Sequence, residues 1–408
     1  MADVIASPEF AKRARHPDHP NAFTRTRSLP LPALVAALLT MRGSSQQSML
    51  DGFFGAVCGT SGFVRGVSDR AFAQARSRLH LPALEWLNAQ FVARVDSQGL
   101  IPRWHGLRVV AGDASVLMPA LRACHRTRGA AAADQRLFAL YLPGAELTLH
   151  AAVHGAGVSE RAMLVETLAC LGKDDLLVLD RGYPAAWLAR LLVERGQRFV
   201  MRCDSTSGFA VVRDFMRSGL AERVVQLPAP SARDAADWAC AARPTTVRLV
   251  RHTAPGGQVR VLMTNVTLDI ADAADFSGLY HRRWRIEEAF KRLKHRMHLE
   301  CVSGLSQHAL LIDVAAKVLA DNLASLMCSA AAAQLQPDDT PRRCNRSYAA
   351  GLTARVFAPV LLWIGDVVGA IHDAFGLLGR TTQRYLRGRS RPRPEHHVKP
   401  HPSLVYKG

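Results

Sequence analysis

The 408-residue chain lacks several features that mark particular classes of protein. Its eight cysteines form no Cys-x-x-Cys pair, which argues against a zinc site and favours reduced thiols in a cytosol. The longest run without a charge, residues 322–337, is shorter than the ~20 apolar residues that span a bilayer. The first residues have neither a basic stretch nor a long apolar one, so a secretory signal is not expected. These absences predict a cytoplasmic protein without a membrane partner.

Acidic residues are scarce relative to basic ones. The chain has 52 Lys and Arg against 34 Asp and Glu, a net charge of +18. Such a charge attracts polyanions, although by itself it does not distinguish DNA from RNA or an anionic membrane. Apolar residues are plentiful, at 49% of the chain, which excludes disorder throughout. The length favours two to four domains.

Two patterns succeed each other along the chain. Residues 1–100 have helical spacing and a basic segment after Ser68, which predicts a helical DNA-binding domain; a helical cap with a solvated basic face is the alternative. From residue 101, short apolar runs with a period of two indicate strands, with a hairpin turn at Pro143-Gly144. The continuous apolar run at 176–179 indicates a strand that is buried on both faces. Strands then alternate with helices, so we expect a mixed α/β sheet.

The later part of the chain divides into further regions. Residues 204–268 read as a β-rich insertion, so the α/β domain would consist of residues 101–203 and 269–305. Residues 306–379 are helical in pattern and are a candidate dimerisation region. Residues 380–408 are basic and rich in proline, which predicts a disordered tail that contacts polyanions.

Two aspartates stand out because they lie where predicted strands end. Asp113 lies in or at the end of the first long strand, and Asp180 directly follows the buried strand. Small or turn-forming residues follow each, so both carboxylates are expected to project at a sheet edge. Either aspartate taken singly is also compatible with a turn or a helix cap.

A third acid belongs to a helix expected over residues 275–297. At ~100° per residue, one stripe of this helix carries four polar residues beside an apolar face: Tyr280, Arg283, Glu287 and Lys294. Glu288 points in another direction. An exposed amphipathic helix with an Arg283–Glu287 pair would have the same spacing.

Two aspartates and a glutamate form a set that suits phosphodiester chemistry. Two Mg²⁺ ions can stabilise both the attacking and the leaving oxygen, and Mg²⁺ prefers oxygen ligands while keeping several waters. Neighbouring Arg and Lys side chains would then hold the phosphate backbone.

These residues resemble the DDE transposases of the IS-four family of bacterial insertion sequences. The family signature Tyr-x2-Arg-x3-Glu-x6-Lys is matched in full by Tyr280, Arg283, Glu287 and Lys294. The second motif, Asp-Arg-Gly-Tyr, is matched by residues 180–183. The first motif often has Gly after its Asp, whereas this chain has Asp113-Ala114-Ser115. The likeness extends over residues 105–300.

The resemblance implies a fold and a set of functional residues. The fold would be RNase H-like, a mixed sheet flanked by helices, and the 106 residues between Asp180 and Glu287 agree with the β-rich insertion that is common in the family. Asp113, Asp180 and Glu287 would bind two Mg²⁺, for which Mn²⁺ can substitute. Tyr280, Arg283 and Lys294 would contact the DNA end near the scissile phosphate.

The resemblance also implies an activity and partners. The protein would bind the terminal inverted repeats of an insertion sequence, cleave the DNA at its ends and join the freed 3′-hydroxyls to target DNA. It would move the element by cut and paste through a hairpin, as a homodimer on paired ends, in the nucleoid of a bacterial cytoplasm. Two alternatives stay open: a non-catalytic DNA-binding protein derived from a transposase, and an RNase H-like nuclease. Trp238 of the insertion is expected to pack in the core; the resemblance implies, as the alternative, an aromatic residue that stacks on a flipped base.

Overall fold

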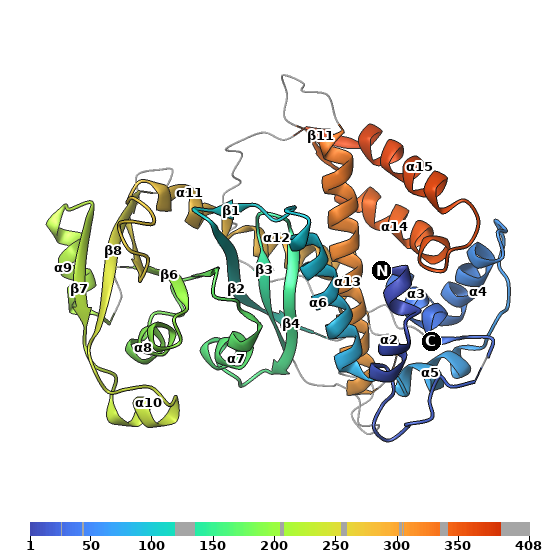
Figure 1. Ribbon diagram of the computed structural model, residues 1–408, viewed down its shortest axis with the longest axis horizontal. Helices are drawn as coiled ribbons and strands as arrows, with labels where there is room; N and C mark the ends of the chain where they lie inside the picture. The colour runs from blue at the N-terminus through green and yellow to red at the C-terminus, as the bar shows by residue number, and fades with distance from the viewer. Residues whose placement is uncertain are drawn as a thin grey trace. The chain divides into compact units, whose positions relative to one another are not determined.

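The computed structural model describes residues 1–25, 27–42, 45–118, 135–204, 208–253, 259–301, 304, 306–334 and 342–384 (Figure 1). Contacts within the chain divide it into two units. The helical unit comprises Met1–Arg94, Val116–Gln135 and Ala289–Gly408. The sheet unit comprises Val95–Ser115 and Arg136–Glu288.

The sheet unit is built on a mixed β-sheet. Its strands are β1 (Arg103–Trp104), β2 (Leu107–Leu117), β3 (Gln135–Leu142), β4 (Leu147–Gly155), β5 (Asp175–Leu179), β6 (Arg198–Cys203), β7 (Glu222–Leu227), β8 (Thr245–Thr253) and β9 (Val259–Thr264). Their order is β4-β3-β2-β5-β6-β9-β8-β7, with β1 paired to β2. Strands β2, β5 and β6 are parallel, whereas β6, β9, β8 and β7 are antiparallel. The mixed α/β sheet that the sequence predicts is confirmed.

The segment 204–268 is rich in strands, as the sequence predicts, but it does not form a separate sheet. Its strands β7, β8 and β9 continue the main sheet, because β9 pairs with β6 in the register Cys203↔Val261. The sequence Pro255-Gly256-Gly257 predicts a turn between β8 and β9, and these residues lie outside the described ones.

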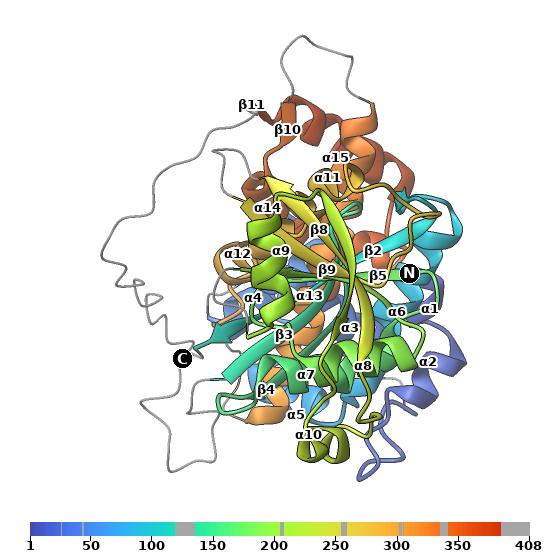
Figure 2. The ribbon, with the colours of Figure 1, turned by 90° about the vertical axis from the view of Figure 1, so that its left-hand side faces the viewer.

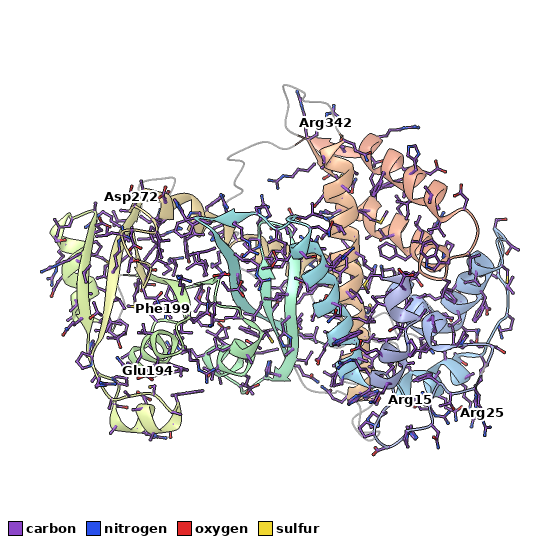
Figure 3. The ribbon with its side chains drawn as sticks, in the orientation of Figure 1. Arg15, Arg25, Glu194, Phe199, Asp272 and Arg342 are labelled. Carbon is purple, nitrogen blue, oxygen red and sulfur yellow. The ribbon has the colours of Figure 1, made fainter. Side chains whose placement is uncertain are left out.

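Helices cover both faces of this sheet. They are α7 (Glu160–Thr167), α8 (Ala186–Glu194), α9 (Ala210–Ser218), α10 (Ala232–Asp237) and α11 (Asp275–Arg282). Leu176 and Val178 of β5 pack in one apolar cluster with Phe276 of α11. Neighbouring side chains of a strand point to opposite faces, so Leu177 and Leu179 face the other way, and all four are fully buried. In Figures 1 and 2, α11 lies towards the top of the sheet unit and α7 and α8 towards its bottom, and Phe199 lies on β6 within the sheet (Figure 3).

The helical unit contains helices from the N-terminal and the C-terminal parts of the chain. Its helices are α1 (Ala2–Ile5), α2 (Pro8–Arg13), α3 (Leu31–Thr40), α4 (Gln46–Val57), α5 (Asp69–Ser77), most of α6 (Leu81–Ser97), most of α12 (Arg285–His295), α13 (Gln307–Ala333), α14 (Arg346–Leu361) and α15 (Val367–Arg380). The long helix α13 carries buried polar residues, and each pairs with another part of the unit. Asp313 lies 3.5 Å from Arg76, and Asp321 lies 3.0 Å from Arg292. These pairs neutralise charges that would otherwise be costly to bury.

Two expectations from the sequence need correction. The helix expected over residues 275–297 is interrupted after Arg282, and α12 begins at Arg285. The tail expected to be disordered from Arg380 includes Thr382–Arg384, which form strand β11 and pair with β10 (Arg342–Cys344). Residues 385–408 lie outside the described residues.

Within the described ranges, no helix combines the length and the apolar character needed to cross a membrane.

Candidate active site

The register between two parallel strands places Asp113 beside Asp180. Arg108 of β2 lies opposite Asp175 of β5, and its guanidinium donates to both carboxylate oxygens, at 2.6 and 2.8 Å. Such a bidentate pair fixes how the two strands align. The register continues to Ala111↔Val178; two residues further along the chain lie Asp113, still in β2, and Asp180, directly after the end of β5. The two acids therefore reach the same edge of the sheet.

Asp113 is an acid in a largely desolvated position. Its side chain is 17% exposed, its Oδ2 lies 3.3 Å from Nη1 of Arg283, and its Oδ1 accepts from the backbone N–H of Ala114 at 2.9 Å. Burial raises the pKa of the Asp113 carboxyl to about 6, although Arg283 and the Ala114 N–H oppose that shift. The charges of Asp180 and Glu160 raise this pKa further. Burial is therefore the main reason why the ionised form of Asp113 is costly at this position.

Asp180 begins a tight loop after β5. Its Oδ1 accepts from the backbone N–H of Gly182 at 2.7 Å, so the side chain and the loop hold each other. Arg161 of α7 clamps the same loop by donating to the carbonyls of Gly182, at 3.0 Å, and Pro184, at 3.3 Å. The loop is thereby fixed to the first turn of α7.

Arg283 links Asp113 to Glu287. Its Nη2 lies 3.3 Å from Oε1 of Glu287, and its side chain is only 5% exposed. The guanidinium lies 6.0 Å from the ring centre of Tyr280, which is itself buried. Its Nε finds no hydrogen-bond partner in the described part of the chain.

The interruption between α11 and α12 lies at Arg283 and Trp284. The N–H groups of Arg283, Ile286 and Glu287 bond to carbonyls three residues earlier, at 3.1–3.2 Å, rather than four. Such bonds tighten the turn, so helical geometry extrapolated across it is only approximate. Ile286 is nevertheless buried, Glu287 half-buried and Glu288 exposed, as the wheel predicts. Trp284 is 46% exposed, and its ring stacks on that of His281 with ring centres 6.5 Å apart.

Lys294 belongs to the helical unit, unlike the other signature residues. Its ammonium group donates to the carbonyl of Val116 and lies 3.6 Å from Glu300. Glu300 also accepts from the N–H of Met118 at 2.9 Å. Lys294 thus holds the end of β2 within the helical unit. A role in DNA contact stays a prediction.

Two residues near the aspartates received no role from the sequence. Glu160 lies in the first turn of α7, after the N-cap Ser159, and its carboxylate faces the loop of Asp180. The phenol of Tyr183 is buried and its hydroxyl has no hydrogen-bond partner in the described part of the chain. No local pattern marks Glu160, because an acid after an N-cap serine is common at helix starts. Tyr183 belongs to the matched motif, which indicates its presence but not its surroundings.

A pocket of about 520 Å³ adjoins this loop. Its lining includes Glu160, Gly182, Trp187 and Trp238. The two indole rings stack in parallel, with ring centres 4.2 Å apart. Trp238 is thus half-buried by packing on Trp187, while part of it still lines the pocket.

The three acids of the signature motifs have side chains of the type that binds divalent cations. Asp113, Asp180 and Glu287 offer hard oxygen ligands of the kind that Mg²⁺ prefers. Burial, and to a smaller extent the charges of Asp180 and Glu160, raise the pKa of Asp113, so a nearby cation would favour its ionised form. In this structure the positive charge next to Asp113 and Glu287 comes from Arg283. Within the described residues, no three His, Cys, Asp or Glu side chains are close enough together to hold a metal ion.

Comparison with known proteins bears on the same residues. A family model described as "Transposase DDE domain" matches residues 110–323, more than half of the chain. No curated protein matches the chain. A solved structure, the piggyBac transposase synaptic complex with hairpin DNA, has 9% sequence identity and a TM-score of 0.42, over 95% of this chain and 86% of that chain.

The matched range begins in β2, just before Asp113, and includes Asp180, Arg283 and Glu287. Because the match covers more than half of the sequence and every one of these acids, the chain belongs to the family of transposases with a DDE domain.

Proposed function

We propose that this transposase belongs to the IS-four type and mobilises an insertion sequence. It binds the terminal inverted repeats of the element, cleaves the DNA at those ends and joins the freed 3′-hydroxyls to target DNA. The observation that supports this proposal best is the alignment of Asp113 with Asp180 at one sheet edge, with Glu287 linked to Asp113 through Arg283.

In this proposal Asp113, Asp180 and Glu287 hold two Mg²⁺ ions, for which Mn²⁺ can substitute. Such ions stabilise charge on the attacking and leaving oxygens of a phosphodiester. Water, and later the 3′-hydroxyl of the DNA, is the nucleophile, so no side chain forms a covalent bond. Arg283, which now pairs with Asp113 and Glu287, would be available to hold a DNA phosphate if those carboxylates held cations.

The remaining signature residues contact DNA in the same proposal. Tyr280 and Arg283 lie next to the acids in the sheet unit, where they would position the DNA end. Lys294 would contact the backbone of the end, and the net charge of +18 would draw the duplex to the protein. Two copies would pair the two ends, in the cytoplasm of a bacterium.

The test uses a supercoiled plasmid that carries the inverted repeats flanking the coding region. The wild-type protein with Mg²⁺ should cleave at the repeats, and cleavage should stop in excess EDTA. Asp113→Asn, Asp180→Asn and Glu287→Gln should each lose cleavage by orders of magnitude while still binding the repeats. Glu288→Gln is the matched control, because its side chain is exposed one position further along the same helix.

Three results would contradict the proposal. Binding without cleavage by the wild-type protein would favour a non-catalytic DNA-binding protein. Cutting that ignores the repeats would favour a nuclease. Loss of activity in Glu288→Gln but not in Glu287→Gln would show that the wrong glutamate has been assigned.

A further inference from the structure

Glu160 and Asp180 face one small space above Gly182. A methyl group placed on Gly182 would lie 3.1 Å from Oδ1 of Asp180 and 3.8 Å from Oε2 of Glu160. The absence of a side chain at residue 182 therefore keeps open a gap that two carboxylates border.

The surroundings hold both carboxylates at this gap. Arg161 fastens the first turn of α7 to the carbonyls of Gly182 and Pro184. The Gly182 N–H fixes Asp180. Because Glu160 and Arg161 are neighbours on α7, the clamp also sets the position of Glu160.

The loop that begins at Asp180 also carries a buried hydroxyl, that of Tyr183, whose backbone N–H donates to the carbonyl of Asp180 at 3.4 Å. Tyr183 is fully buried, and its hydroxyl has no hydrogen-bond partner within the described ranges. Burial raises the pKa of Tyr183 well above its ordinary value, and the charges of Glu160, Asp113 and Asp180 raise it further. A buried hydroxyl without a partner is costly to the folded protein. A ligand with an oxygen at this place would remove that cost.

The geometry points to Glu160 as a fourth carboxylate of the site, which binds a divalent cation together with Asp180 above Gly182, while Tyr183 donates a hydrogen bond to an oxygen ligand of that cation. This inference rests on the proposed function, because it adds a ligand to the cation site of the same reaction. The bound species is Mg²⁺ or Mn²⁺, since all the protein ligands are carboxylate oxygens.

A purely structural role for Glu160 makes a different prediction. Its carboxylate lies 3.4 Å from Nη1 of Arg136, with both side chains about one-third exposed. A pair that exposed stabilises a protein by little. If the role of Glu160 is only to pair with Arg136, removal of either side chain should change Mn²⁺ binding to the same extent. If Glu160 binds a cation, loss of Arg136 should leave cation binding intact or strengthen it, because a competing positive charge is removed.

The experiment measures Mn²⁺ binding to the full chain without DNA, from the electron paramagnetic resonance signal of free Mn²⁺. Glu160→Gln should weaken Mn²⁺ binding by about tenfold or more, the loss expected when a group of a metal site is removed. Arg136→Gln should bind Mn²⁺ at least as tightly as the wild type. Glu166→Gln is the matched control, because it removes an exposed carboxylate from the same helix and should bind normally.

A second variant guards against a folding defect in Glu160→Gln. Gly182→Ala keeps every carboxylate but fills the gap, and it should also weaken Mn²⁺ binding. Melting temperatures in EDTA should match the wild type for the variants that are compared.

The outcomes separate this inference from the proposed function. If Asp180→Asn loses Mn²⁺ binding and cleavage while Glu160→Gln and Gly182→Ala bind normally, the inference is wrong and the proposed function stands. Equal weakening by Glu160→Gln and Arg136→Gln would also overturn it, in favour of the ion pair. If Asp113→Asn and Asp180→Asn bind Mn²⁺ like the wild type as well, the cation site of the proposed function is wrong too.

Discussion

At the scale of single residues, Asp113 combines burial with an incomplete supply of positive charge. Arg283 lies 3.3 Å from it but is shared with Glu287, and Asp180 and Glu160 add negative charge nearby. A functional carboxylate in such a place costs stability in the folded protein, which is a common property of active sites.

This cost predicts how stability depends on pH without metal. The pKa of Asp113 rises from an ordinary value near 3.8 to about 6 in the folded state, so folding favours the protonated form. The favourable contribution is present at low pH and is lost as the pH rises through about 6. In EDTA, Asp113→Asn should therefore be more stable than the wild type at pH 7, by roughly 1–3 kcal/mol.

Urea unfolding at several pH values checks this prediction. The difference in the free energy of unfolding between Asp113→Asn and the wild type should shrink as the pH falls towards 4. At that pH the aspartate is itself neutral in the folded state. A variant that is less stable than the wild type at pH 7 would show that the pair with Arg283 outweighs the burial of Asp113.

At the scale of elements, two glycines of α4 have opposite roles. A methyl group on Gly55 would overlap the backbone carbonyl of Gly62, whereas one on Gly52 would meet only the Phe63 ring, at 3.6 Å. The close approach at Gly55 also carries a hydrogen bond from the N–H of Thr60 to its carbonyl, at 2.9 Å. Gly55 thus allows the following loop to fold back on the helix.

Alanine at these two positions should shift stability in opposite directions. Gly55→Ala must push the loop away and should destabilise the protein by about 1–3 kcal/mol. Gly52→Ala has room for the methyl group and should stabilise it by roughly 0.5–1 kcal/mol, because alanine favours a helix. Free energies of unfolding in urea measure both changes, and shifts of the same sign would refute this account of α4.

The signature segment shows how far helical periodicity extends. The stripe expected from 3.6 residues per turn correctly pairs Arg283 with Glu287, which are four residues apart. It is less reliable over the full distance from Tyr280 to Lys294, because the turn at Arg283 is tightened and the two ends belong to different units.

At the scale of the whole molecule, positive charge is the dominant long-range property. Residues 385–408 contain six Lys and Arg and one acid, Glu395, so they contribute a large share of the net charge of +18. Removal of this segment should weaken sequence-independent DNA binding at low salt and make log K less steep in log[salt], by about 0.9 for each phosphate contact that is lost.

Binding to random duplex DNA over a range of salt concentrations measures this effect. Cleavage at the inverted repeats should persist, because none of the proposed site residues is removed. An unchanged salt dependence would show that the segment does not contact DNA phosphates.

The sequence by itself determined the elements and the candidate acids. Strand β5 was predictable because a short apolar run bounded by turn residues is a local signal, and Asp180 follows it directly. Arg283 and Glu287 were predictable as neighbours because a spacing of four is set within one turn of helix. The family motifs then joined these acids into one expected site.

Tertiary structure alone decided which other groups meet these acids. Glu160 reaches the loop of Asp180 because Arg161 clamps α7 to residues 182 and 184, a contact between segments that are distant in the sequence. Arg283 spans Asp113 and Glu287 because the fold brings β2 next to the turn between α11 and α12, 170 residues later in the chain. Such contacts depend on sheet order and register, and a local hydrophobic pattern carries no information about either beyond its own element.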